Sequence, residues 1–531
     1  MTLRSSLDGE RFDVLVIGGG INGVAIAREC ARAGRRTLLV EQLDFAAGTT
    51  SRSTRIIHGG LRYLEHGDLA QVRESLRERQ RLVRERPQLV RPLEFLLALD
   101  GHSRRSALAV HAGLWFYRKL GGAVRGGSPQ SQQNALERLL DAGRHFSVFS
   151  FQDAQCEFPE RLVAEWLTEM IAAGGTARNH TKVLAVELRD GRAVAVRLRD
   201  SMSGAEERVE ATWTINATGP WADQICQSSG ISTGHPMVGG VRGSHIVLPK
   251  FAGAPEAAVY TEAVDGRPIF IIPWNDQILV GTTEVPDTND PAQVRPSDDE
   301  LEYLWRSFQQ LFPGIRIARN EVHYAFAGVR PLPYSPQAQP LAISRRHYFH
   351  DHAADGAQGM ISVIGGKLTT AASLARECVA KIGTAVSEPV TLAMVSGDEV
   401  RTAFERAISE VAQRGEISRK AAHAMVEWHG EKALAIAAMA RGRAEFQAPL
   451  CPHTDHIVAE AVHAVDHECA VTLADVLLRR VPVALGACWS QECSRQAAHR
   501  IASATGWDEN RVGQELEGLD LERESFLQRP R

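Results

Sequence analysis

The sequence has few of the features that are typical of membrane-spanning or secreted proteins. None of its 531 residues belongs to an apolar run near the ~20 residues that a membrane-spanning helix needs. No apolar stretch precedes the first predicted strand, so we expect no signal peptide. The eight cysteines form no CxxC pair, which favours reduced thiols in a cytoplasmic protein. Attachment to the cytoplasmic face of a membrane stays open.

The sequence also has no excess of charge of one sign. Its 60 Lys and Arg residues oppose 64 Asp and Glu residues, which leaves a formal net charge of −4. This balance gives no reason to expect nucleic acid as a partner. Hydrophobic residues make up 44% of the chain and charged residues 23%, which is typical of a globular protein. The length of the chain predicts about three domains. Any site for an anion must therefore be local.

The first forty residues carry a dinucleotide-binding pattern. Residues 12–17 (FDVLVI) predict a buried strand, and Gly18, Gly20 and Gly23 follow as G-x-G-x-x-G before a predicted helix. These glycines permit a tight turn, close approach of a pyrophosphate and close helix packing. Glu41 ends a second predicted strand, where it can accept hydrogen bonds from a ribose. The motif alone does not separate NAD from FAD.

Two later segments favour FAD. Residues 212–219 (TWTINATG) and 360–366 (MISVIGG) each predict a strand that ends in a glycine turn. They resemble segments of the flavoprotein superfamily of D-amino-acid oxidase and glycine oxidase. That resemblance implies FAD as the cofactor, bound by a domain that the start, middle and late parts of the chain build together.

Five further segments narrow the resemblance. They are IHGGLRYLE (57–65), VRGSHIVLP (241–249), FIIPWNDQILVGTTE (270–284), FAGVRPL (326–332) and GGKLTT (365–370). In this order they resemble signatures of the FAD-dependent glycerol-3-phosphate dehydrogenase family. The resemblance implies that sn-glycerol 3-phosphate, a small phosphorylated alcohol, passes a hydride from C2 to flavin N5 and leaves as dihydroxyacetone phosphate. It also implies a quinone or similar electron acceptor.

The predicted fold class is α/β. We expect a discontinuous Rossmann-like FAD-binding domain from residues 1–90, 156–235 and 326–390. A mixed-sheet substrate domain would take residues 91–155 and 236–325, and an α-helical C-terminal domain residues 391–531. The sequence leaves the oligomeric state open, with a homodimer as one alternative.

The family match assigns the site residues. His245, Arg330 and Lys367 are the predicted catalytic residues, because arginine forks suit a phosphate and an imidazole suits proton removal near neutrality. A buried structural histidine is the alternative for His245, and ion pairs are the alternative for each cation alone. The predicted substrate-binding residues are Arg62, Tyr63, His245, Arg330, Lys367 and Thr369. The predicted cofactor-binding residues are Gly18, Gly20, Asn22, Gly23, Glu41, Thr50, Ser51, Ser53, His58, Gly60, Leu61, Val183, Ala217, Gly219, Gly366, Lys367, Leu368 and Thr369.

The sequence departs from the family in two places. Residues 333–336 (PYSP) stand where members commonly carry an acidic loop, and Ala371 and Ala372 stand where members usually have Tyr-Arg. The loss of an aromatic side chain and a cation could widen the pocket or alter the substrate. Two other functions therefore stay open. One is an FAD-dependent oxidase of another hydroxy or amino compound that uses oxygen, and the other is a non-catalytic flavin-binding sensor or scaffold.

Two remaining segments allow more than one interpretation. Trp115, Phe116 and Tyr117 lie beside Arg118 and Lys119, which fits either a membrane-contacting face or core packing. The Cys/His-rich segment from Cys451 through Cys469 fits no zinc pattern well, so we expect no metal.

Overall fold

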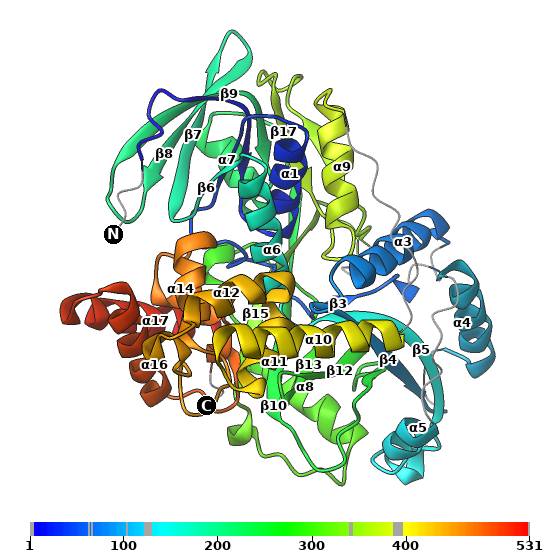
Figure 1. The fold of residues 1–531 in the computed structure, drawn as a ribbon. Helices are drawn as coiled ribbons and strands as arrows, with labels where there is room; N and C mark the ends of the chain where they lie inside the picture. Colours follow the sequence, from blue (N-terminus) through cyan, green and yellow to red (C-terminus); the bar gives the residue numbers. More distant parts are fainter. Residues whose placement is uncertain are drawn as a thin grey trace.

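The computed structural model describes residues 5–61, 64, 67–101, 103, 105–121, 130–338, 343–385 and 397–528. Two β-sheets and a group of C-terminal helices make up this part of the chain (Figure 1). The predicted α/β fold with a helical C-terminal domain is confirmed. Among the described helices, none combines the length and the apolar character that crossing a bilayer requires.

The first sheet is mainly parallel and joins distant parts of the chain. Its strand order is β16-β17-β9-β1-β2-β6, in which only the β16 pairing is antiparallel, and β7 and β8 continue from β9 as an antiparallel hairpin. Leu15 and Val16 of β1 have no exposed surface, as their apolar run predicts. The strands are β1 (Arg11–Ile17), β2 (Thr37–Val40), β6 (Thr176–Arg178), β7 (Thr181–Arg189), β8 (Arg192–Asp200), β9 (Glu206–Asn216), β16 (Tyr348–Asp351) and β17 (Met360–Ile364).

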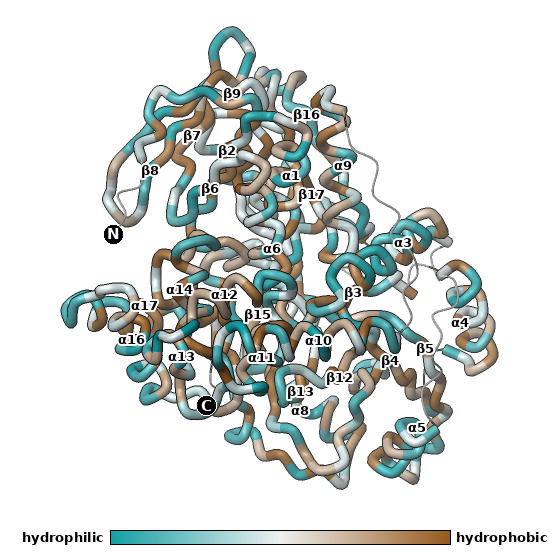
Figure 2. The backbone as a smooth tube through the Cα atoms, viewed as in Figure 1, coloured by the Kyte–Doolittle hydropathy of each residue, from teal (hydrophilic) through white to brown (hydrophobic). Residues whose placement is uncertain are grey.

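Helices pack against the first sheet, and one of them begins at its glycine-rich turn. Helix α1 (Ile21–Arg32) begins after β1 and packs against both α6 (Pro159–Ala172) and α9 (Ala371–Lys381) in one apolar core. The short helix α7 (Ala222–Ser228) packs against β7. Hydrophobic residues concentrate in α1 and the strands beside it, whereas α3 is largely hydrophilic (Figure 2).

The second sheet is mixed. Its order is β14-β10-β13-β12-β11-β4-β5-β3, with β15 paired to β10, and only β11 and β4 run parallel. Strands β3 and β15 join this sheet, although our boundaries group most of their residues with the FAD-binding domain, so the division of the chain stays a proposal. The strands are β3 (Ile56–Ile57), β4 (Val90–Leu99), β5 (Ser147–Cys156), β10 (Val238–Pro249), β11 (Ala258–Glu262), β12 (Pro268–Trp274), β13 (Gln277–Gly281), β14 (Val285–Pro286) and β15 (Tyr324–Pro333).

Four helices accompany the second sheet. Helix α3 (Leu69–Glu85) begins at Asp68, whose carboxylate accepts a hydrogen bond of 3.1 Å from the Gln71 amide, and α4 (Ala107–Gly121) packs against it. Helix α8 (Asp298–Leu311) begins in a capping box of Ser297 and Glu300 and packs against β10, and α5 (Gln130–Glu137) is short.

The C-terminal helices share an apolar core with the second sheet. Ser418 caps one of them, with its hydroxyl accepting a hydrogen bond of 3.1 Å from the Ala421 amide. They are α10 (Gly397–Gly415), α11 (Arg419–His429), α12 (Ala433–Ala440), α13 (Ala444–Gln447), α14 (Val458–His467), α15 (Leu473–Asp475), α16 (Gln491–Thr505) and α17 (Glu509–Phe526). The described chain also contains a π-helical segment, η7 (Val476–Arg480). Its short 3-10 helices are η1 (Ala142–Arg144), η2 (Gly219–Trp221), η3 (Pro291–Gln293), η4 (Arg319–Glu321), η6 (Gly430–Lys432) and η8 (Val483–Leu485).

Candidate active site

The turn after β1 is built for a close backbone approach. Gly18 has a φ of +104°, and a Cβ atom there would lie 2.7 Å from the carbonyl oxygen of Ala217. A Cβ atom on Gly23 would lie 1.8 Å from the carbonyl oxygen of Gly18. Any side chain at either position would force the strand, the helix and the residue 216–219 turn apart. The glycines therefore keep the N-terminal amides of α1 open to a phosphate.

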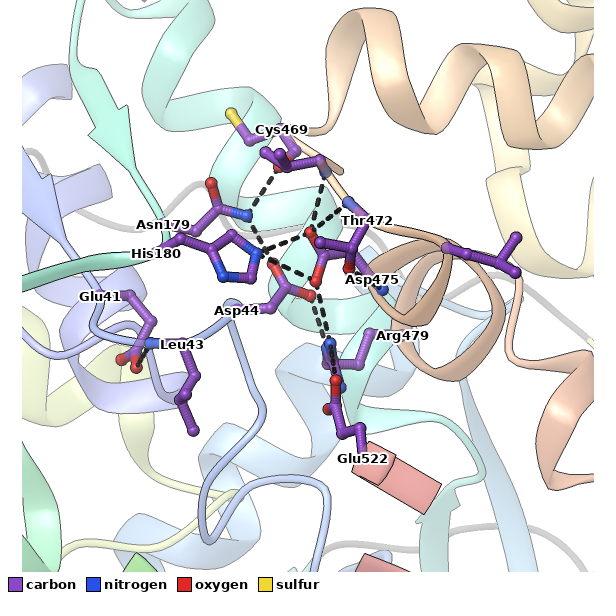
Figure 3. A network of polar contacts seen from close by, with 12 residues as sticks. Glu41, Leu43, Asp44, Asn179, His180, Cys469, Thr472, Asp475, Arg479 and Glu522 are labelled. Carbon is purple, nitrogen blue, oxygen red and sulfur yellow. Dashed lines mark hydrogen bonds and ion pairs between the residues drawn. The ribbon is translucent and has the colours of Figure 1, made fainter. Parts of the chain in front are cut away.

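Two polar side chains hold the turn in place. The Thr50 hydroxyl accepts a hydrogen bond of 3.0 Å from the Ile21 amide at the start of α1. The Glu41 carboxylate accepts a hydrogen bond of 2.6 Å from the Gly19 amide. It also accepts one of 2.9 Å from the Leu43 amide (Figure 3). Burial raises the pKa of Glu41, and the two amides oppose that shift. Glu41 thus lies beside the glycines, where a ribose next to the pyrophosphate would meet it.

The late Gly-Gly turn meets the first helix. Asn22 Nδ2 donates a hydrogen bond of 3.3 Å to the Gly365 carbonyl, and a Cβ atom on Gly366 would lie 2.6 Å from Asn22 Nδ2. Asn22 Oδ1 is buried and has no hydrogen-bond partner in the described part of the chain. An unsatisfied buried acceptor and the side-chain-free cradle both fit a bound dinucleotide. These residues suit the FAD that the sequence predicts.

Three other predicted cofactor-binding residues lie where their side chains do not by themselves indicate a bound ligand. Ser51 is buried and its hydroxyl donates to the Ala46 carbonyl at 2.7 Å. Gly219 has a φ of +59° and begins the turn after β9. Val183 lies on β7 with its side chain in the core, so only its backbone is available to a ligand.

A cavity of about 260 Å³ lies beyond the Gly-Gly turn, between segments of both sheets. Nine predicted residues line it: Ser53, His58, Gly60, Leu61, His245, Arg330, Lys367, Leu368 and Thr369. Its cationic lining consists of Arg52, Arg55, Arg330, Arg345 and Lys367, against the single carboxylate of Asp153 among the described lining residues. Glu160 and Glu284, outside the lining, pair with Arg55 and Arg345, so the positive charge that suits an anionic ligand comes from the other lining cations.

His245 lies on β10 between two neighbouring strands. Its ring stacks on Phe326 with centroids 4.9 Å apart, and Nε2 lies 3.0 Å from the Thr54 hydroxyl. Nδ1 is buried without a hydrogen-bond partner in the described residues. Burial lowers the pKa of His245 to about 3, and the charges of Arg330 and Arg55 act in the same direction. The imidazole is therefore neutral at physiological pH and can accept a proton.

Arg330 points its guanidinium toward β10. Its Nη2 donates a hydrogen bond of 2.9 Å to the Thr282 hydroxyl, and its Nη1 donates one of 3.2 Å to the Thr283 carbonyl. A Cβ atom on Gly243 would lie 2.5 Å from Nη2, so the glycine makes room for the guanidinium. Gly243 lies two residues before His245. Because it has no side chain, the Arg330 guanidinium and the His245 imidazole can both line the same wall of the cavity.

Lys367 and Thr369 enter the cavity from the Gly-Gly turn. Burial lowers the pKa of Lys367 to about 7; Glu74 opposes this shift and Arg345 adds to it. The Thr369 hydroxyl accepts a hydrogen bond of 3.1 Å from the His58 amide, 311 residues away in the sequence. Arg62 and Tyr63 lie outside the described residues, so their assignment to this site stays a prediction.

A buried network beneath residues 58–61 was not predicted. Asp153 on β5 accepts hydrogen bonds from the Tyr117 hydroxyl at 2.9 Å, from Arg79 at 2.5 Å and from the Gly59 amide at 3.2 Å. Burial raises the pKa of Asp153, and Arg79 opposes that shift. Tyr117 is thus a core residue, whereas Trp115 of the same aromatic cluster is 59% exposed.

Further lining residues escaped the sequence analysis. Arg52 and Thr54 are the chain neighbours of the predicted residue Ser53, and Thr282 lies in the motif of residues 270–284, so these adjacent positions were the available signal. Arg345 lies in no recognised motif, and it pairs with Glu284. The departures from the family lie elsewhere. Ala371 and Ala372 begin α9 and are buried in its core, and neither lines the cavity.

Known proteins share this architecture. The family described as FAD dependent oxidoreductase matches residues 13–372, and the C-terminal domain of alpha-glycerophosphate oxidase matches residues 390–512. A glycerol-3-phosphate dehydrogenase from Synechocystis is 36% identical over 89% of each chain. A D-erythritol 1-phosphate dehydrogenase from Brucella abortus is 34% identical over 69% of this chain and 72% of its own. The solved glycerol-3-phosphate dehydrogenase from Bacillus halodurans, complexed with FAD, shares the fold with a TM-score of 0.77 at 23% identity, covering 98% of this chain and 96% of its own.

Proposed function

Because the chain belongs to the FAD-dependent glycerol-3-phosphate dehydrogenase family, with FAD as its cofactor, we propose that it oxidises sn-glycerol 3-phosphate to dihydroxyacetone phosphate. One observation carries the proposal. His245, Arg330 and Lys367 come from three separate segments and line one cavity. A phosphate-bearing alcohol requires fixed cations for its phosphate and a neutral base for its hydroxyl proton, and this cavity has both.

The cations perform the binding step. Arg330 is held by Thr282 and Thr283, so its guanidinium is oriented before a ligand arrives. A phosphate dianion between Arg330 and Lys367 keeps Lys367 protonated, because an adjacent negative charge raises the pKa of an ammonium group. Once the phosphate is fixed, the length of the substrate sets the distance between the phosphate and the carbinol carbon and so positions that carbon in the cavity.

The neutral His245 performs the proton step. It accepts the hydroxyl proton while the substrate is oxidised. The phosphate offsets the positive charge of Arg330, which is one of the charges that lower the pKa of His245. Substrate binding therefore makes the imidazole a stronger base when it is needed. When bound, FAD supplies the acceptor for the hydride that leaves C2.

We further propose that a quinone or similar acceptor takes the electrons at a membrane surface. Helix α4 supports this arrangement, because Leu108 is 85% and Trp115 is 59% exposed, while Arg118 and Lys119 occupy its last turn. Apolar side chains beside cations suit an anionic bilayer. Sedimentation with anionic lipid vesicles tests it. Binding that Trp115→Ser and Leu108→Ser leave unchanged would refute the role of this helix.

The reaction itself is tested by following the flavin absorbance without oxygen. We expect sn-glycerol 3-phosphate to bleach the purified holoenzyme rapidly, and glycerol to leave it oxidised. D-erythritol 1-phosphate is the essential comparison, because a relative with that substrate in its name is 34% identical. Faster bleaching by that compound would replace the proposed substrate. Reoxidation by oxygen with release of hydrogen peroxide, in preference to a quinone, would make the protein an oxidase.

A further inference from the structure

Three side chains among the C-terminal helices present metal-binding atoms to one another. The ligand atoms of Cys451, His453 and Cys493 all lie within 4.8 Å of one another. Cys493 Sγ and His453 Nδ1 are 3.7 Å apart. A tetrahedral zinc ion, with Zn–S of about 2.3 Å and Zn–N of about 2.0 Å, requires ligand atoms roughly 3.5–3.8 Å apart. Small side-chain movements would bring all three onto one ion.

A fourth thiol, that of Cys488, lies near this group but outside the set of ligand atoms within 4.8 Å of one another. The carbonyl oxygen of Cys488 is 3.7 Å from Cys493 Sγ, and Cys488 lines the same cavity as Cys451 and His453. The Cys488 side chain is exposed, so it can turn toward the other three without disturbing the core. Three thiols and one imidazole form a ligand set that structural zinc sites use.

The backbone holds the first pair of ligands in a short closed loop. Pro449 and Ile457 form an isolated β-bridge, and the Leu450 amide donates a hydrogen bond of 2.8 Å to the His456 carbonyl. This closure brings Cys451 and His453, two residues apart, to one end of the loop. Two ligands therefore need no large loss of chain entropy when an ion binds.

The other pair lies where α16 begins. Ser490 caps this helix, with its hydroxyl accepting a hydrogen bond of 3.2 Å from the Cys493 amide. Cys493 is thus in the first helical turn. Cys488 lies two residues before the capping residue Ser490, in the turn that leads into α16.

We propose that Cys451, His453, Cys488 and Cys493 bind one divalent ion of the zinc class. This replaces our expectation from sequence that the segment binds no metal. That expectation considered residues 451–469, whereas His453 and Cys493 are 40 residues apart and meet only in the folded chain. Binding releases the thiol protons to solvent. Four protein ligands leave no open position, so the ion is structural and takes no part in the redox reaction.

The position of the cluster indicates what the ion stabilises. The carbonyl oxygen of Leu485, three residues before Cys488, accepts hydrogen bonds from Gln277 Nε2 at 3.0 Å and from the Tyr324 hydroxyl at 2.7 Å. Those residues begin β13 and β15, and β15 carries Arg330. The ion would therefore fix one of the loops through which the helical domain contacts the second sheet.

Elemental analysis of the purified FAD-bound protein is the first test. After gel filtration in metal-free buffer with a thiol reductant, we expect about one zinc per chain. Removing it with a chelator and adding Co²⁺ should produce the sulfur-to-cobalt charge-transfer band and the visible bands of tetrahedral cobalt. Loss of the metal should lower Tm, and added zinc should restore it.

Variants identify the ligands. Cys493→Ser and His453→Gln should each reduce the bound zinc at least tenfold and make Tm insensitive to the chelator. His453 is exposed, so its variant keeps the test valid if Cys493→Ser does not fold. His423→Gln alters another histidine of the same cavity outside the ligand set and should retain the zinc. Four outcomes would overturn the proposal: no cobalt band in the reduced protein, unchanged zinc in both ligand variants, a Cys451–Cys493 disulfide, or iron with acid-labile sulfide.

Discussion

A Cβ atom on Gly281 would lie 2.2 Å from Cδ2 of His245, its cross-strand neighbour on β10. Phe326 occupies the matching position on β15, on the other side of His245. The imidazole is therefore held between an aromatic ring and a bare backbone. Its placement depends on the absence of a side chain at Gly281.

Gly281→Ala should displace His245 and lower kcat/KM for the phosphorylated substrate by about 10²-fold, because a shift of about 1 Å in a reacting group has that effect. FAD content should be unchanged, since Gly281 lies away from the β1 turn. Gly314→Ala is the matched control, because a Cβ atom there meets nothing within 4 Å. Equal activity of the two variants would contradict the base assignment.

Arg330→Lys should keep a positive charge and lose the planar fork. We expect kcat/KM to fall about 10²–10³-fold, equivalent to ~3–4 kcal/mol of transition-state stabilisation, since one ammonium group cannot replace two directed N–H donors. Steady-state kinetics with a quinone analogue would measure it. Arg295→Lys, at an exposed position outside the cavity, should behave as the unmodified protein. A small effect at Arg330 would remove it from the phosphate site.

Lys367 should make anion binding depend on pH. Its pKa of about 7 in the ligand-free site means that a rising pH removes its proton, whereas a bound phosphate requires the protonated form. The Kd of ethyl phosphate, whose own second pKa is about 6, should therefore rise up to about tenfold per pH unit above pH 7. Titrations of the flavin spectrum between pH 7 and 9 would show this.

Lys367→Arg provides the control for that dependence. Arginine stays protonated throughout this range, so the Kd of the variant should be nearly constant between pH 7 and 9. A flat profile in the unmodified protein would show that Lys367 keeps its proton without a ligand.

Asp44→Asn should destabilise the whole protein. Asp44 follows β2, and its carboxylate accepts a hydrogen bond of 2.5 Å from Arg479 in the C-terminal domain (Figure 3). It also accepts hydrogen bonds of 2.8 Å from Arg480. All three side chains are buried. The variant leaves the buried Arg480 without its carboxylate partner, whereas Arg479 keeps Asp475 and Glu522. Removing one partner of the buried Arg480 pair costs about 3–5 kcal/mol of unfolding free energy.

Thermal and urea unfolding would measure that loss. Glu10→Gln breaks the exposed pair of Glu10 with Arg36 and should cost less than about 1 kcal/mol. Similar losses of unfolding free energy in the two variants would show that the contacts of Asp44 with the C-terminal domain do not stabilise the protein.

The dinucleotide-binding unit could be predicted from the order of residues along the chain. Its strand, glycines, helix and terminal acid follow one another directly, and the steric demands on Gly18 and Gly23 are set by their immediate neighbours. Helix caps at Asp68 and Ser418 were predictable for the same reason, because a cap bonds to an amide three residues away. The family motifs then identified His245, Arg330 and Lys367 as candidates without locating them relative to one another.

The contacts between distant side chains arise from the packing of the folded chain. Thr54 and His245 are 191 residues apart, and His58 and Thr369 are 311 apart, yet each pair is in hydrogen-bonding contact. No local pattern encodes such contacts, because they depend on how β10 and the Gly-Gly turn pack against the loop after β2. The same holds for Asp153 beneath that loop and for the three thiols near His453. Burial, which lowers the pKa values of His245 and Lys367, likewise exists only once the sheets and helices have excluded water from the site.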